Sequence, residues 1–78
     1  MRTGAFVSEL EKILNMRKGT LRMEDGPANV KAWDSMALVD ILATIDGLGV
    51  DLSYETITAA KTVGQLLELL KSRGVLQD

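Results

Sequence analysis

Aliphatic side chains recur at three- and four-residue steps between residues 38 and 48, and this pattern constrains the fold more than any other feature of the chain. Such steps line one face of an α-helix. Ser35 stands just before the pattern, and Gly47 and Gly49 supply signals that end a helix. We therefore expect a helix from Ser35 to about Asp46 or Leu48, with a stripe made of Leu38, Ile41, Leu42, Ile45 and Leu48.

The N-terminal segment carries the same spacing. Its apolar residues predict a helix from about Gly4 to Met16, and Thr3 is a candidate N-cap for it. The stripe of this helix consists of Phe6, Leu10, Ile13 and Leu14, with Val7 alongside.

A short helix is predicted after residue 52. Ser53 is placed to cap it, and Leu52 and Ile57 occupy the two positions of a hydrophobic staple. The helix should end near Ala59 or Ala60.

The last helix begins with a capping-box pattern at residues 62–65, Thr-Val-Gly-Gln. Gly74 is expected to end it, with Val75 and Leu76 folding back on the last turn and residues 77–78 fraying. Its buried stripe is expected to be Val63, Leu66, Leu67 and Leu70.

Residues 17–34 form a connection of unusual length for so small a chain. Helical periodicity disappears there, and Gly19, Gly26 and Pro27 favour a loop. Trp33 is interpreted as a packing anchor, because an aromatic residue ahead of a helix more often packs than binds a ligand. The expected apolar anchors of the loop are Leu21, Met23, Val30 and Trp33.

Composition excludes several classes of function. The 78 residues suffice for a single domain, residues 1–78, and contain neither Cys nor His. This composition excludes disulfides, thiolate nucleophiles, Ser-His-Asp arrangements and the common zinc ligands. We therefore expect neither an enzyme nor a metal site. The charged residues Glu9, Glu11 and Lys12 argue against a signal peptide or membrane span in the first segment, and we expect a soluble, cytoplasmic monomer.

The charge balance also argues against nucleic-acid binding. The net charge is −2, and the one cluster of bases, Arg17, Lys18 and Arg22, is interpreted as a solvated loop. A helix-turn-helix protein would need a basic recognition helix, whereas residues 35–46 contain Asp40 and Asp46 and no Lys or Arg.

Ser35 is the candidate functional residue. At a helix N-terminus its hydroxyl would lie near unsatisfied backbone N–H groups and the positive end of the helix dipole, a setting that favours phosphate. Asp and Ser are also ordinary helix caps, so Asp34 or Ser35 taken alone is interpreted as a cap.

From about Phe6 to Leu70 the chain resembles the acyl carrier and peptidyl carrier proteins. The resemblance rests on Asp34-Ser35-Met36 opening the second of four helices, after a long loop. It implies an all-α, four-helix bundle with three longer helices and a short third one, in which the long connection runs the length of the bundle and the first two helices lie nearly antiparallel. The sequence Trp33-Asp34-Ser35 is similar to the one found in many discrete carriers of specialised pathways.

The resemblance also implies a chemistry for the site. Ser35 would carry 4′-phosphopantetheine added from coenzyme A by a phosphopantetheinyl transferase, which Asp34 helps to recognise, and the thiol would hold an acyl, amino-acyl or polyketide intermediate for partner enzymes of fatty-acid-like or specialised biosynthesis. The expected partner face comprises Met36, Val39, Asp40, Ala43 and Asp46, which is less acidic than the face of fatty-acid carriers. Residues that could part to admit an acyl chain are Leu42, Ile45, Leu48, Leu52 and Ile57, each of which is equally explained as core.

An alternative from another class stays open. The chain could be an unmodified helical interaction domain, in which Met36 and Val39 bind a partner helix and Ser35 acts only as a cap. The mass of the protein after exposure to a transferase distinguishes the two hypotheses.

Overall fold

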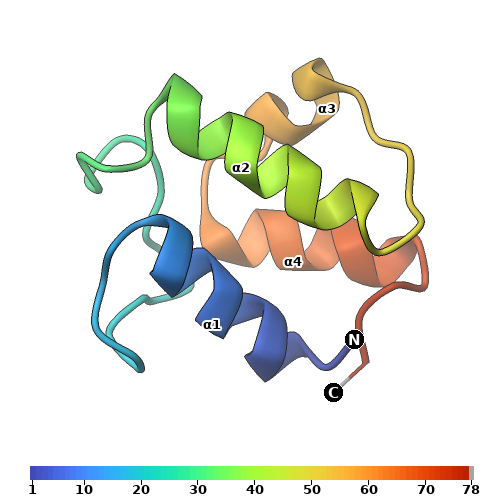
Figure 1. The fold of residues 1–78 in the computed structure, drawn as a ribbon, viewed down its shortest axis with the longest axis horizontal. Coiled ribbons are helices and arrows are strands. Elements are labelled where there is room, and N and C mark those ends of the chain that lie inside the picture. The colour runs from blue at the N-terminus through green and yellow to red at the C-terminus, as the bar shows by residue number, and fades with distance from the viewer. Residues whose placement is uncertain (78) are drawn as a thin grey trace.

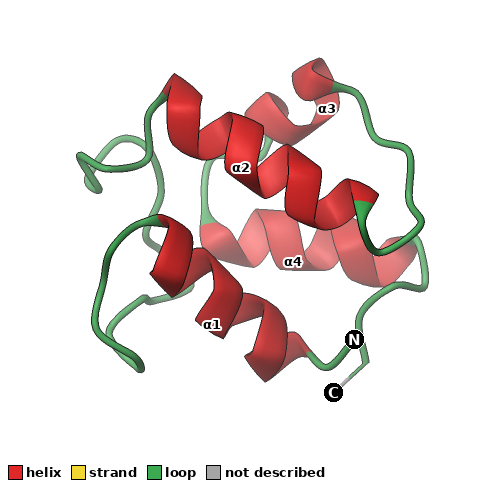
Figure 2. Cartoon of the chain, viewed as in Figure 1, coloured by secondary structure: helices red, strands yellow, loops and turns green. Residues whose placement is uncertain are grey.

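Four α-helices make up the regular structure of residues 1–77, the part of the chain that this computed structural model describes (Figures 1 and 2). None of these helices combines the length and apolar character that crossing a bilayer requires. The four helices confirm the prediction of an all-α fold with a short third helix for the described residues. The helices are α1 (Thr3–Ile13), α2 (Ser35–Asp46), α3 (Tyr54–Ala59) and α4 (Val63–Ser72).

The starts of α2, α3 and α4 are fixed by side-chain caps. Asp34, Ser53 and Thr62 each accept a hydrogen bond from the backbone N–H three residues ahead. Each cap satisfies one of the donors that a helix leaves unpaired at its N-terminus. The caps predicted for α3 and α4 are confirmed, and at α2 the capping residue is Asp34, not Ser35.

The capping box of α4 is completed in an unexpected way. Gln65 N–H donates to Thr62 Oγ1 at 3.1 Å, as the pattern predicts. The side-chain oxygen Oε1 of Gln65, however, accepts from the backbone N–H of Lys61 at 2.7 Å, one residue before the cap. The glutamine therefore fixes the chain that enters the helix.

The predicted cap and end of α1 are wrong. The N-cap is Arg2, which makes no side-chain cap bond, and Thr3 is already helical. The helix ends at Ile13, three residues before Met16, because Asn15 adopts a left-handed conformation with φ of 57°.

The core is built from one face of every helix. α2 packs against both α1 and α3, and Figure 1 shows α1 and α2 running in opposite directions. All four residues of the predicted α4 stripe are buried. The largest fully buried side chains are Phe6, Leu10, Ile41, Ile45, Leu66, Leu70 and Val63.

The connection between α1 and α2 stays at the end of the molecule where α1 ends and α2 begins, so it does not run the length of the bundle (Figure 1). Leu21 and Trp33 are buried anchors as predicted, and Val30 packs against the core. Met23 is 47% exposed, so its side chain is not an anchor. Its carbonyl instead accepts from Gly64 N–H at 2.9 Å, and backbone pairing rather than apolar burial holds that part of the loop.

A buried acid ties the start of this loop to α1. Glu11 is only 3% exposed, and its Oε2 accepts from Gly19 N–H at 2.8 Å and from Leu21 N–H at 3.0 Å. A carboxylate that accepts two backbone bonds satisfies donors that would otherwise be costly to bury. The sequence analysis took Glu11 only as a charge within an apolar pattern and missed this contact.

The two ends of the described chain lie together (Figure 1). Thr3 N–H donates to Gln77 O at 2.8 Å, and Gln77 N–H donates to Met1 O at 2.9 Å. The prediction that Gln77 frays is therefore wrong, and Asp78 lies outside the described residues. Leu76 is buried, as expected for a segment that folds back.

Candidate functional site

Ser35 is the first residue of α2, and its side chain is exposed. Asp34 precedes it in extended conformation, with φ of −109° and ψ of −170°, and its Oδ1 accepts from Ala37 N–H at 3.0 Å. Because Asp34 performs the capping, the Ser35 hydroxyl is not needed for it. Within residues 1–77 that hydroxyl makes no hydrogen bond.

The backbone around Ser35 adds unpaired donors. The N–H groups of Ala37 and Leu38 bond to the side chain and carbonyl of Asp34. Those of Ser35 and Met36 have no acceptor among the described residues. Unpaired N–H groups and the helix dipole favour an anion at this position. An exposed hydroxyl beside them fits a phosphate ester.

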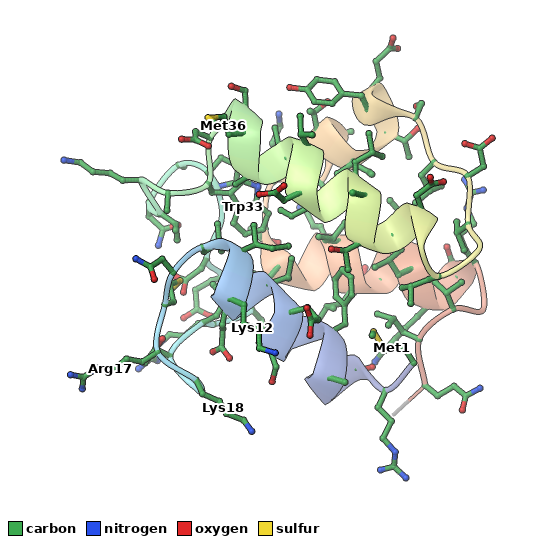
Figure 3. All side chains as sticks on the ribbon, viewed as in Figure 1. Met1, Lys12, Arg17, Lys18, Trp33 and Met36 are labelled. Carbon is green, nitrogen blue, oxygen red and sulfur yellow. The ribbon has the colours of Figure 1, made fainter. Side chains whose placement is uncertain are left out.

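Trp33 holds the entry to α2 in place. Its side chain is 4% exposed, and its N–H donates to Val30 O at 3.0 Å. Figure 3 shows its position beside the start of α2. The indole Nε1 is buried and has no hydrogen-bond partner within residues 1–77. The predicted role as a packing anchor is therefore correct.

The predicted partner face lies together on the exposed side of α2. Met36 is 77% exposed and Val39 58% exposed, which makes them the most exposed of the large hydrophobic residues in the described chain. Asp40, Ala43 and Asp46 are exposed on the same helix. The exposed side of the helix therefore combines apolar side chains with two carboxylates, and Asp40 lies one turn after Met36.

The predicted acyl-pocket residues lie on the inner sides of α2, α3 and the segment that joins them. Ile45, Leu52 and Ile57 are buried, whereas Leu42 and Leu48 are half-buried and pack against the core. The structure thus places all five in or beside one aliphatic core, the arrangement that a purely structural role also requires.

The loop that leads to the site contains one carboxyl whose pKa is shifted. A hydrogen bond from Arg22 N–H, followed by one from the Asn29 side chain, holds the pKa of Asp25 below its ordinary value. These bonds close a turn in the loop rather than create reactive chemistry. Residues 1–77 contain no cluster of carboxylates placed to share a metal ion.

Comparison of the chain with models of known families, with curated proteins and with solved structures gave no significant match.

Proposed function

We propose that this protein is an acyl carrier. The Ser35 hydroxyl is esterified by 4′-phosphopantetheine, and the thiol of that group holds an acyl, amino-acyl or polyketide intermediate as a thioester. The protein catalyses no step itself. It works as a cytoplasmic monomer that presents its cargo to the enzymes of fatty-acid-like or specialised biosynthesis.

One observation carries the proposal. Ser35 opens a 12-residue helix, and its exposed hydroxyl does not cap that helix because the preceding Asp34 does. Within residues 1–77 the hydroxyl makes no other hydrogen bond. The fold therefore does not require this hydroxyl, which leaves it accessible for esterification. Together with Asp34-Ser35-Met36 after a long loop, this freedom favours modification.

The residues present fit the attached group. In the transfer, the hydroxyl oxygen of Ser35 forms a bond to the phosphorus of coenzyme A that bears the pantetheine. The pyrophosphate bond breaks, adenosine 3′,5′-bisphosphate leaves, and the hydroxyl proton is released. The unpaired N–H groups of Ser35 and Met36 lie next to the phosphate that results. Asp34 keeps the start of the helix ordered while the transferase binds.

The proposal is tested by the intact mass of the protein after incubation with coenzyme A and a broad-specificity phosphopantetheinyl transferase. We expect one added phosphopantetheine on the parent and none on Ser35→Ala. Ser53→Ala is the matched control, because Ser53 is also an exposed serine at a helix start but caps α3. It should accept the group, and an unmodified parent would contradict the proposal.

The exposure of Met36 favours a second candidate. A methionine that is 77% exposed beside Val39 is the kind of flexible apolar surface that binds a partner helix. In that case the protein is an unmodified interaction domain. Failure of the parent to accept phosphopantetheine, with retained folding, would favour this function.

A further inference from the structure

A half-open cavity of about 180 Å³ lies against α1 and the start of the following loop. It is lined by Ser8, Glu11, Lys12, Met16 and Lys18, none of which belongs to α2. Its volume corresponds to about six water molecules. The cavity is thus large enough for a small polar molecule and separate from the Ser35 site.

Glu11 gives the cavity a buried acceptor. Both backbone bonds to this side chain fall on Oε2, and Oε1 has no partner within the described residues. Among the residues of this part of the chain that are not exposed, Trp33 Nε1 is the one side-chain N or O atom that is buried without a hydrogen-bond partner. Glu11 Oε1 also lacks a partner but is not such an atom, so it keeps some solvent-accessible surface. A carboxylate oxygen so placed accepts most strongly from a cationic donor.

The rim of the cavity carries positive charge. The Lys18 ammonium has no partner in residues 1–77, whereas Lys12 forms an ion pair with Glu9 at 3.5 Å. Figure 3 shows Lys12 and Lys18 on the same side of the molecule, with Arg17 extending away from them. The Ser8 hydroxyl is also without a hydrogen bond in this part of the chain.

We propose that this cavity binds a small zwitterion of the α-amino-acid class. The ligand's ammonium group donates to Glu11 Oε1, its carboxylate accepts from Lys18, and its side chain lies along the Met16 thioether. A simple cation would be repelled by Lys12 and Lys18, and a simple anion by Glu11. A molecule with both charges meets a complementary partner at each end.

The test is an NMR titration of the ¹⁵N-labelled protein with leucine, N-acetylleucine and leucinamide. We expect saturable shifts of amide signals in residues 8–21 with leucine, at a Kd in the millimolar range typical of so few contacts. The two analogues, which keep one charge each, should bind at least about tenfold more weakly. No saturation with leucine up to roughly 50 mM, well above that range, would overturn the proposal.

Two variants test the site itself. Lys18→Ala should weaken leucine binding at least about fivefold, since it removes the partner of the carboxylate. Arg17→Ala removes an adjacent charge that does not line the cavity and should bind like the parent. Equal binding by both variants, or equal binding of leucine and its analogues, would show that the cavity is not a zwitterion site. All these outcomes are independent of modification at Ser35.

Discussion

Residues that lie close together in this sequence differ sharply in whether the fold buries or hydrogen-bonds their side chains. Ile45 has no exposed surface, whereas Ala43 lies two residues earlier on the same helix and is exposed. The Asp34 carboxylate caps α2, whereas the Ser35 hydroxyl makes no hydrogen bond within residues 1–77. The cap at α2 therefore does not depend on the Ser35 side chain.

The inner side of α2 should be far more sensitive to substitution than the outer side. Ile45→Ala should lower the free energy of unfolding by about 2–5 kcal/mol, because it leaves a cavity among buried side chains. Leu42→Ala, at a half-buried position, should fall at the lower end of that range. Ala43→Ser should be nearly neutral. Urea unfolding measures all three, and a larger loss for Ala43→Ser would mean that the stripe of α2 is wrongly assigned.

Removal of the Glu11 side chain should destabilise the protein by roughly 2 kcal/mol or more, because Gly19 and Leu21 N–H groups would lose their acceptor. The matched control is Glu9→Ala on the same helix, which loses only an exposed ion pair to Lys12 worth about 0.5 kcal/mol. Thermal unfolding of both variants checks the difference. Equal losses would contradict the role of Glu11 as the tie between α1 and the loop.

At the scale of elements, α2 contributes to the core on one side and carries the two most exposed large hydrophobic residues of the described chain on the other. Its stripe packs on α1 and α3, while Met36 and Val39 face solvent. The two acids of this surface differ in position, since Asp40 lies one turn after Met36 and Asp46 is the last residue of the helix. We expect partner recognition by α2 to depend more on contact with Met36 and Val39 than on these two charges.

Turnover of the transferase on variants of α2 tests that expectation. Met36→Ala and Val39→Ala should impair modification more than Asp40→Asn or Asp46→Asn, since a buried aliphatic contact contributes about 1.5–3 kcal/mol. An exposed ion pair contributes about 0.2–1 kcal/mol and weakens with salt. The rates should be compared at low and physiological salt, with each variant shown to be folded. Large losses only in the Asn variants at both salt levels would establish electrostatic recognition.

The helices were predictable from sequence because their signals are local. Apolar spacing and the caps Ser53 and Thr62 identify α3 and α4 closely, since a cap and its partner are three residues apart. The contact from Glu11 to Leu21 was not predictable from sequence. An acid beside an apolar stripe is usually a surface residue, and only the position of the loop after α1 shows that this one is buried. The pairing of Thr3 with Gln77 joins opposite ends of the chain and leaves no local pattern. At the candidate site, the sequence left Asp34 and Ser35 as alternative caps of α2, and only the geometry showed that Asp34 supplies the cap.

At the scale of the whole molecule, backbone contacts between distant segments join the helices into one structure. Asp25 O accepts from Val63 N–H at 2.8 Å, so the loop before α2 docks on the start of α4. Gly26 is buried at this junction, where a Cβ atom would overlap the carbonyl of Lys61. The long loop is thus part of the folded body and positions the chain that enters the Ser35 site.

Gly26→Ala should therefore be among the most damaging single changes, with a loss of more than about 2 kcal/mol in unfolding free energy, because backbone must move on both sides. Gly4→Ala is the control, since nothing lies near its added methyl group and α1 gains a better helix former. That variant should gain about 0.5 kcal/mol. Denaturant unfolding of both variants checks the contrast. A Gly26→Ala protein as stable as the parent would show that the loop does not dock on α4.

The central claim, that Ser35 carries the prosthetic group, is tested most directly by fragmentation mass spectrometry of the protein after reaction with the transferase and coenzyme A. The account predicts a single phosphopantetheine located on Ser35, with every other hydroxyl residue unmodified. An unmodified chain, or the group located on another residue such as Ser53, would contradict it.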